Sequence, residues 1–446
     1  MKIFKNIKGT IDFFDLDYDK IKFLIKKIKK FFKIYGFIPL KTPSIENYKI
    51  INKIKNPLNN TKKLIYYVNN NQSKNKNNKF LIFDLTIPLL RFLLTNKNNI
   101  IFPFKRYQIQ KVWRGENTQY NRYREFYQCD VDIISFKYSI IEELELISLC
   151  DNIFYELNLK VIFFINHKYI LYGLCELFNI PKKKWIFFIS NIDKIDKIGK
   201  KKVIYKLNKY IDKIIIKKIF NIFNKKLDNI NFILYLKKIF KKNNCIYGNK
   251  GIDNLIKIFD YLKYLNLKII KIKFKIYLSR GLNYYNKTIF EVVSLYKKKN
   301  KNKCLSLVGG GRYDNIIKIN KKKIYCIGLS FGLYRIYNIL KTKIYNIKNI
   351  KVIFINFGII NIIYKYLNIL RNNNLITEIF PYNAKIKKQI KYAIKKKFNF
   401  IIILGKKEIK NKIIKIKNLY TKKEKTFSSI NNLIGYFKKK NKILKK

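Results

Sequence analysis

The stretch that most limits the fold of this chain is residues 80–135, where side chains alternate around a polar tip at residues 116–121. Alternation with a period of two is typical of β-strands, because successive side chains of a strand point to opposite faces of a sheet. Two such segments joined by a polar tip predict a long antiparallel hairpin. The chain is therefore expected to fold around an antiparallel sheet.

Helices and further strands are expected on both sides of this hairpin. Apolar residues recur at helical spacing in 19–35, and two prolines exclude a helix interior in GFIPLKTPSIE (36–46). A Lys-rich segment of helical period, 194–270, is expected to be an insertion, so that the first domain covers 1–193 and continues over 271–341. Within the first domain, the other predicted elements are a helix at 139–157, a strand at 159–165, a helix from His167, strands at 272–296 and 304–308, and a helix at 329–341.

The pattern changes after a basic hinge near residues 341–348. The following segments predict strand, helix, strand, helix and strand in turn, at 350–357, 360–372, 375–380, 383–397 and 399–404. A βαβαβ order favours a separate and mostly parallel α/β domain, here taken as 348–446. The whole chain is therefore assigned to the α+β class.

The charge of the chain is extreme. Its 446 residues include 97 Lys and Arg against 27 Asp and Glu, for a formal net charge of +70 at pH 7. Such a surface is typical of a protein with a polyanionic partner, since basic side chains displace counterions from phosphate backbones. AT-rich codons explain the pattern equally well, because Lys, Ile, Asn, Tyr and Phe share them and the chain has only 16 Gly and 7 Pro. The charge is compatible with RNA without proving it.

Several classes of protein are disfavoured by the sequence. The six Cys are scattered without a C-x-x-C pair and there is one His, which argues against a zinc site or a disulfide framework. No apolar run approaches the length of a membrane span, and Asp12 and Asp15 lie where a signal peptide would be apolar. A cytoplasmic protein with buried, reduced thiols and no resident metal is expected, and His167 is interpreted as structural.

The hairpin itself carries the first candidate site. Its two strands bring together on shared faces Arg114 and Glu116, and Phe126, Gln128, Asp130 and Asp132. A purine would stack on Phe126 and a phosphate would meet Arg114. A small cationic or hydrogen-bonding substrate would meet Gln128 and Asp132. The alternative is a charged, solvated hairpin without a ligand. No P-loop or Rossmann glycine motif is present, and GGGRYD (309–314) alone predicts only a tight turn.

Seven segments together resemble one enzyme family. VWRGENTQYNRYREFYQCDVDI (112–133) resembles motif 2 of class II aminoacyl-tRNA synthetases, and its second half resembles the histidyl-tRNA synthetases in particular. GFIPLKTPSIE resembles motif 1, with Pro43 at the place of its dimer-interface proline, and IGLSFGLYRI (327–336) resembles motif 3. The further matches are FDLTIPLLRF (83–92), LSRGLNYYNKTIFE (278–291), VGGGRYD (308–314) and, for a C-terminal anticodon-binding domain, IFPYNAKIKKQIKYAIKK (379–396).

This resemblance implies a fold and a histidine site. The fold would be a class II antiparallel catalytic sheet flanked by helices, with a helical insertion and a C-terminal anticodon-binding domain. Asp84 and Thr86, from the D-L-T segment that includes Leu85, would hold the α-amino group of histidine together with Gln128 of the hairpin. The imidazole would be recognised by Asp132, Tyr284 and Tyr285, because its two nitrogens need partners of fixed polarity.

The resemblance also implies an ATP site. Arg114 would contact the histidine carboxylate and the α-phosphate, and Arg280 would stabilise negative charge there in place of a metal ion. Arg114, Arg280 and Arg335 would be the catalytic residues, while adenine and the outer phosphates would be bound by Glu116, Phe126, Arg122 and Arg335. The implied reaction converts histidine and ATP to histidyl-adenylate and pyrophosphate, then loads tRNA(His) at its 3′ end. Mg²⁺ would accompany ATP, no other cofactor is implied, and the protein would be a homodimer.

The sequence departs from the family pattern in four places. IDFFDLD (11–17) lacks an Arg and a Pro, Asn283 replaces an Asp, Tyr334 replaces a Glu, and the loop 117–121 differs from common forms. Two rival interpretations stay open. One is a catalytically inactive paralogue that regulates histidine biosynthesis, although such paralogues lack the anticodon domain and usually the catalytic arginine. The other is a basic RNA-binding protein without catalysis.

Overall fold

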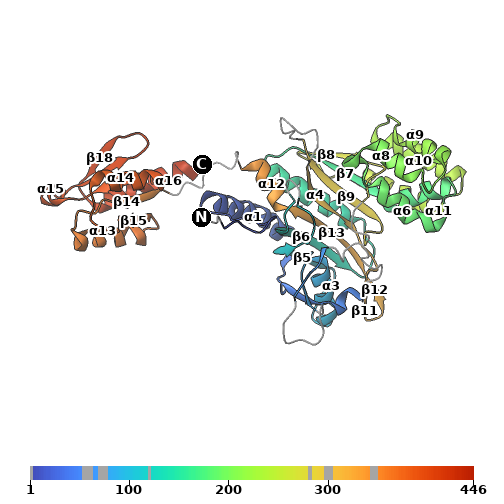
Figure 1. Ribbon diagram of the computed structural model, residues 1–446, viewed down its shortest axis with the longest axis horizontal. Coiled ribbons are helices and arrows are strands. Elements are labelled where there is room, and N and C mark those ends of the chain that lie inside the picture. Colours follow the sequence, from blue (N-terminus) through green and yellow to red (C-terminus); the bar gives the residue numbers. More distant parts are fainter. Residues whose placement is uncertain are drawn as a thin grey trace. The chain divides into compact units, whose positions relative to one another are not determined.

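The chain folds into two compact units, residues 1–343 and 344–446 (Figure 1). The computed structural model describes residues 4–52, 64–68, 79–118, 122–279, 284–295, 305–341 and 350–445. A search of these residues finds no helix with the length and apolar character that crossing a membrane requires. Each unit has a β-sheet at its centre.

The larger unit is organised by a sheet that, in the described residues, has eight strands in the order β1-β5-β6-β13-β10-β9-β7-β8. Neighbours pair antiparallel except at the two edges, where β1 with β5 and β7 with β8 are parallel. The bounds are β1 Ile38–Pro39, β5 Phe104–Trp113, β6 Glu125–Ser135, β13 Tyr325–Gly332, β10 Ser306–Arg312, β9 Thr288–Ser294, β7 Val161–His167 and β8 Ile270–Phe274. The antiparallel catalytic-type sheet that the sequence predicted is present.

The predicted hairpin is confirmed as β5 and β6, but the expectation of strands throughout 80–135 is wrong. Residues Thr86–Thr95 form the helix α3, which follows the short strand β4 (Lys79–Leu81). This helix buries Ile87, Leu89, Leu90 and Leu93 on the sheet. Because it is apolar almost all round, its sequence period does not distinguish helix from strand.

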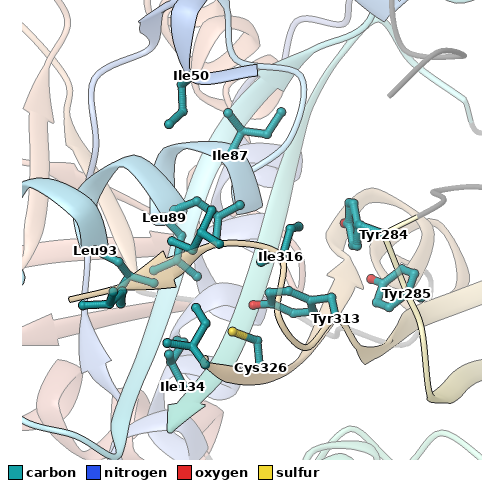
Figure 2. Packing of buried hydrophobic residues seen from close by; sticks show 14 of the residues in the cluster. Ile50, Ile87, Leu89, Leu93, Ile134, Tyr284, Tyr285, Tyr313, Ile316 and Cys326 are labelled. Carbon is teal, nitrogen blue, oxygen red and sulfur yellow. The ribbon is translucent and has the colours of Figure 1, made fainter. Parts of the chain in front are cut away.

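Two layers cover the sheet. On one side lie α1 (Leu16–Ile34), α4 (Ile141–Glu156) and α12 (Leu333–Leu340), and α1 buries Ile21, Leu24, Ile28 and Phe32 at helical spacing. On the other side α3 packs into a core with β13, the residues that follow β10 and the segment after residue 283, as Figure 2 shows for Leu89, Tyr313 and Cys326. A small sheet, β2 (Ile45–Asn47), β4 and β3 (Tyr66–Tyr67), borders this core with α2 (Lys49–Asn52) and the hairpin of β11 (Lys318–Ile319) and β12 (Lys322–Lys323).

A group of helices connects the parallel strands β7 and β8. It comprises α5 (Lys168–Leu177), α6 (Lys182–Ile192), α7 (Ile195–Ile198), α8 (Lys200–Leu207), α9 (Lys213–Phe223), α10 (Asn229–Lys242) and α11 (Ile246–Leu262). His167 caps α5, since its Nδ1 accepts a hydrogen bond from the backbone N–H of Tyr169, and burial lowers its pKa to about 3. Helices α5 and α11 cross closely at Gly173 and Gly248. The helices therefore begin at Lys168, upstream of the predicted insertion.

The smaller unit has its own sheet, ordered β15-β14-β16-β17-β18 in the described residues. The central strand β14 (Lys351–Phe354) pairs in parallel with β15 (Ile376–Ile379) and β16 (Phe400–Ile403). With α13 (Ile360–Asn372) and α14 (Ile386–Lys395) these strands make the predicted βαβαβ order. The sequence did not predict the antiparallel strands β17 (Ile414–Asn418) and β18 (Glu424–Phe427), nor the helices α15 (Lys406–Lys410) and α16 (Ile430–Lys445).

The close crossing of α5 and α11 leads to a stability prediction. In Gly173→Ala the added methyl would lie 2.3 Å from the Cα of Gly248, so one helix must shift. We expect calorimetry to show the free energy of unfolding of the larger unit lowered by about 1–3 kcal/mol. The matched control is Gly435→Ala in α16, where an added methyl meets nothing within 4 Å. That change should stabilise the smaller unit by up to about 1 kcal/mol. Equal changes in the free energy of unfolding for the two substitutions would contradict the close packing of α5 against α11.

Candidate active site

One face of the large sheet carries polar residues where apolar ones are usual. In the register of β5 and β6, Arg106 lies opposite Asp132, Gln108 opposite Asp130, and Gln110 opposite Gln128. Directly paired residues of antiparallel strands share a face, so these six side chains form two adjacent rows. All six are less than a tenth exposed. Buried polar groups at this density need partners, and their arrangement defines the candidate site.

Asp132 and Arg106 form the floor of the site. Arg106 is fully buried, and its Nη2 lies 2.7 Å from Oδ2 of Asp132. The hydroxyl of Tyr313 donates a hydrogen bond to Oδ1 of Asp132. Burial raises the pKa of Asp132, while the charge of Arg106 and the hydrogen bond from Tyr313 oppose this shift. On β13 the residue opposite Asp132 is Gly328, where an added Cβ would lie 2.0 Å from Oδ1, so only glycine leaves room for the carboxylate.

Asp84 is a buried acid with an unused oxygen. It precedes α3, and its Oδ1 accepts a hydrogen bond of 3.1 Å from the backbone N–H of Ile87. Its Oδ2 is buried without a hydrogen-bond partner in the described part of the chain. Burial raises its pKa to about 6, opposed by the bond from Ile87 and the charge of Arg114. A buried carboxylate oxygen without a donor is suited to receiving one from a ligand.

Three tyrosines lie beside these acids. The rings of Tyr284 and Tyr285 are 4.7 Å apart, and that of Tyr284 is 5.7 Å from the ring of Tyr313. Figure 2 shows the three rings together, coming from two different segments. The hydroxyl of Tyr284 lies 3.4 Å from Oγ1 of Thr86, and the Nζ of Lys168 donates to the backbone carbonyl of Tyr285. Hydroxyls and carboxylates therefore line one end of the site.

Gln128 lies at the centre of a hydrogen-bonded group. Its Nε2 donates to Oγ of Ser330 at 3.1 Å and to both oxygens of Asp130 at 3.4 Å. Its Oε1 accepts from Nη2 of Arg114 at 3.4 Å. Burial and the charge of Asp132 raise the pKa of Asp130 to about 7, against the attraction of Arg106.

Arginines surround the open end of the site. Arg114 donates from Nε to the carbonyl of Phe83 at 2.9 Å, and its guanidinium lies 5.1 Å from the ring centre of Phe126. Arg122 forms an ion pair with Glu116. Arg335, on α12, donates to the carbonyl of Ser306 at 2.8 Å. A cation over an aromatic ring and further guanidinium groups suit a planar, polyanionic ligand.

A buried ionic cluster holds the tyrosines in place. Arg312 is fully buried, and its guanidinium bonds to Glu142 at 2.8 Å and to Glu143 at 2.6 Å, both at the start of α4. Asp314 pairs with Lys287 at 2.9 Å and accepts from the N–H of Cys326. This cluster fixes the backbone on both sides of Tyr313 and ties it to the segment that carries Tyr284 and Tyr285.

Two places where the chain departs from the family pattern meet in space. The ring of Tyr334 lies 4.9 Å from that of Phe13 and 5.5 Å from that of Tyr123. Burial raises the pKa of Tyr334, so its hydroxyl stays neutral. Aromatic packing therefore joins the segment 11–17 to the position of Tyr334.

Most residues that the sequence singled out can be placed. Asp84, Thr86, Arg114, Gln128, Asp132, Tyr284 and Tyr285 lie on one polar face or against it. Leu85 contributes its carbonyl, which accepts from Nη2 of Arg106 at 3.3 Å. Arg280, Asn283 and residues 119–121 lie outside the described residues.

The sequence did not predict roles for Arg106, Tyr313 or Lys168. Tyr313 belongs to the motif GGGRYD, which drew attention to it, but a glycine-rich turn alone does not indicate a chemical role. Arg106 could also have been identified from the sequence, because the period of two in β5 places its side chain on the inner face of the sheet. As for metal ions, the described residues contain no group of three or more His, Cys, Asp or Glu arranged to bind one.

Comparison with known proteins gives the same family over nearly the whole chain. A sequence model of histidyl-tRNA synthetase matches residues 9–336, and one of the anticodon binding domain matches residues 349–440. The histidine–tRNA ligase of Azobacteroides pseudotrichonymphae is 35% identical, over 96% of this chain and 97% of that protein. That of Christiangramia forsetii is also 35% identical, over 97% and 98%. The crystal structure of histidyl-tRNA synthetase from Nostoc superposes with a TM-score of 0.81 at 25% identity, covering 99% of this chain and 100% of that one.

The buried acids of the site predict an unusual pH dependence of stability. The pKa of Asp130, about 7 in the folded chain, lies above the value of roughly 4 for an unfolded aspartate. The folded state therefore keeps its proton to higher pH, and the free energy of unfolding falls as pH rises from about 4 to 7.

Replacing this acid should remove the effect. Asp130→Asn is expected to raise the free energy of unfolding by up to about 4 kcal/mol at pH 8 and to change it little near pH 4. Urea unfolding of both proteins at the two pH values measures this difference. An equal increase in the free energy of unfolding at pH 4 and at pH 8 would show that Asp130 does not titrate between these values.

Proposed function

The chain belongs to the histidyl-tRNA synthetase family, and from that premise we propose how its residues bind histidine and ATP. Its activity is that of a histidine–tRNA ligase, which activates histidine with ATP and transfers it to the 3′ end of tRNA(His). We propose a catalytic domain over 1–193 and 271–341 with a helical insertion at 194–270. An anticodon-binding domain at 348–446 completes the assignment.

The observation that carries the proposed site is the unused oxygen of Asp84. Its Oδ2 is buried without a hydrogen-bond partner among the described residues, and Arg114, whose charge acts on Asp84, donates to Oε1 of Gln128. Thr86 follows two residues later in the chain. An α-ammonium group carries three donors and a positive charge, which matches one carboxylate, one hydroxyl and one amide oxygen. The ammonium of histidine is therefore assigned to this corner, and its charge would lower the raised pKa of Asp84.

The imidazole is assigned to the end of the site beside Asp132. One ring nitrogen donates and the other accepts in the neutral imidazole, so the pocket needs an acceptor and a donor at fixed places. Asp132 supplies the acceptor, and the hydroxyls of Tyr284 and Tyr285 supply groups that both donate and accept. Tyr313 holds Asp132 through its own hydrogen bond. A pocket of buried polar groups rejects an amino acid that leaves them unpaired, which gives selectivity for histidine.

ATP is assigned to the arginine-rich end. Adenine would stack on Phe126 near Glu116, with Arg114 between the histidine carboxylate and the α-phosphate. Arg122 and Arg335 would hold the outer phosphates, and Mg²⁺ enters with ATP as part of the substrate. Arg280 would stabilise the charge that develops at the α-phosphate. The histidine carboxylate is already ionised, so the displacement needs positioning and fixed positive charge more than a general base.

Two observations favour the ligase over its rivals. A regulatory paralogue would lack the anticodon-binding domain, whereas the match to that domain covers residues 349–440. A basic RNA-binding protein without catalysis would have no use for a buried face of paired acids. The net charge of +70 then suits contact with tRNA phosphates, and we propose a cytoplasmic enzyme.

The activation step can be tested by ATP–pyrophosphate exchange with each of the twenty amino acids. We expect exchange with histidine alone, and a loss of roughly a hundredfold in Arg280→Ala, because a preorganised positive charge at the reacting phosphate is removed. The matched control is Arg371→Ala, since Arg371 lies on α13 of the smaller unit and bonds to the carbonyl of Thr377. Undiminished exchange in Arg280→Ala would remove Arg280 from the mechanism.

Homodimer formation is proposed for the surface around α1 and β1. Apolar side chains are exposed there, including Ile34 at 63% and Ile38 at 52%, and Pro43 follows β1 in the chain. Exposed apolar patches of this kind mark protein interfaces.

This proposal predicts a change of molecular mass. Ile38→Asp should convert the dimer to a monomer in size-exclusion chromatography with light scattering, because an unpaired charge would be buried in the interface. Ile186→Asp, at a residue of α6 that is 70% exposed, is the control and should stay dimeric. A dimeric Ile38→Asp variant would place the interface elsewhere.

A further inference from the structure

Asp130 is the buried acid of the polar face that has no proposed role in binding histidine or ATP. It lies between Gln128 and Asp132 on β6, is only 5% exposed, and no cation pairs with it directly within the described residues. Burying an ionised carboxylate without a partner cation costs free energy, so the presence of Asp130 at this position needs another explanation. Its hydrogen bonds supply one.

The hydrogen-bonding partners of Gln128 allow only one orientation of its side-chain amide. A guanidinium such as that of Arg114 has donors and no acceptor, and an ionised carboxylate such as that of Asp130 has acceptors and no donor. The amide of Gln128 lies between them, so its Nε2 must face Asp130 and its Oε1 must face Arg114, as found.

Ser330 completes the arrangement from the neighbouring strand. Its Oγ accepts from Nε2 of Gln128 at 3.1 Å, and its hydroxyl donates to Asp130. Both amide hydrogens of Gln128 are thereby used inside the protein. Its oxygen is held on the side of Arg114, whose charge also acts on Asp84.

We propose that Asp130 is a positioning residue that, with Ser330, fixes the amide of Gln128 so that its oxygen faces the ammonium of histidine. The inference rests on the proposed role of Gln128 and deepens it. A flipped amide would present two N–H donors to the ammonium and would repel it. Asp130 itself does not touch the substrate.

Ionisation of Asp130 is the state that holds this arrangement, because a protonated carboxyl can donate to Oε1 and stabilise the flipped amide. The charged groups facing Asp130 are Asp132 on its own strand, Arg106 on β5 and Asp84 before α3, with Ser330 on β13. Since the pKa of Asp130 is about 7, affinity for histidine should increase as pH rises through that value.

The first test is a double-mutant cycle on the KM for histidine, measured by ATP–pyrophosphate exchange at saturating ATP. Gln128→Ala should raise this KM roughly 10- to 100-fold, since one hydrogen bond to a charged group is lost. Asp130→Asn should raise it roughly tenfold and leave the KM for ATP unchanged. In the Gln128→Ala background Asp130→Asn should have no further effect, because its target is gone.

Each outcome has a distinct meaning. A normal KM in Gln128→Ala would overturn the role proposed for Gln128. A raised KM there with a normal one in Asp130→Asn would overturn only the inference. Additive effects in the double variant would show that Asp130 contacts histidine itself, which also overturns it.

The pH profile separates positioning from simple loss of structure. The KM for histidine of the wild type, divided by that of Asp130→Asn, should be roughly tenfold higher at pH 6 than at pH 8, because only about a tenth of Asp130 is then ionised. Titration of free histidine affects both proteins alike and cancels. The control is Asp151→Asn, because Asp151 is equally buried but bonds to the backbone N–H groups of Lys268, Ile269 and Ile270. A wild-type ratio independent of pH would overturn the proposal.

Discussion

The buried ion pair between Arg106 and Asp132 is the interaction on which the site depends. Two charges on paired strands are removed from water, and their mutual attraction makes this tolerable only with exact geometry and further hydrogen bonds. Tyr313 and the carbonyl of Leu85 supply those bonds. The pair therefore links the hairpin, the segment before α3 and the end of β10. Burial raises the pKa values of Asp84, Asp130 and Asp132, and the charge of Arg106 opposes that shift in all three.

Glycines on the neighbouring strands make room for the buried acid of this pair. Gly328 lies opposite Asp132, and an added Cβ at Gly310 would lie 2.0 Å from the carbonyl oxygen of Gly328. Gly328 thus leaves room for the carboxylate of Asp132, and Gly310 lets β10 and β13 lie close together. Behind them, Arg312 with Glu142 and Glu143 fixes the strand end that carries Tyr313. In the proposed site, specificity for histidine would rest on side chains carried by these strands.

Much of the fold was predictable from local patterns. The hairpin, the helix α1 and the βαβαβ order of the smaller unit follow from the pattern of apolar residues. Helix α1 buries one side only, whereas β6 and the central strands of the smaller unit are buried on both faces. Helix α3 was mistaken for strand because it is apolar almost all round. Strands β17 and β18 were missed because they are short and basic, with most of β18 exposed.

What the sequence determined by itself is the family and the identity of the candidate residues, because ordered motifs keep the side-chain types that the chemistry requires. What only the tertiary structure decided is how those residues act on one another. Arg106 and Asp132 are 26 positions apart and meet only through strand register. The same is true of Asp130, Gln128 and Ser330, whose mutual orientation follows from which neighbours donate and which accept. Register and hydrogen-bond direction are properties of the packed sheet, so no local pattern in the chain contains them.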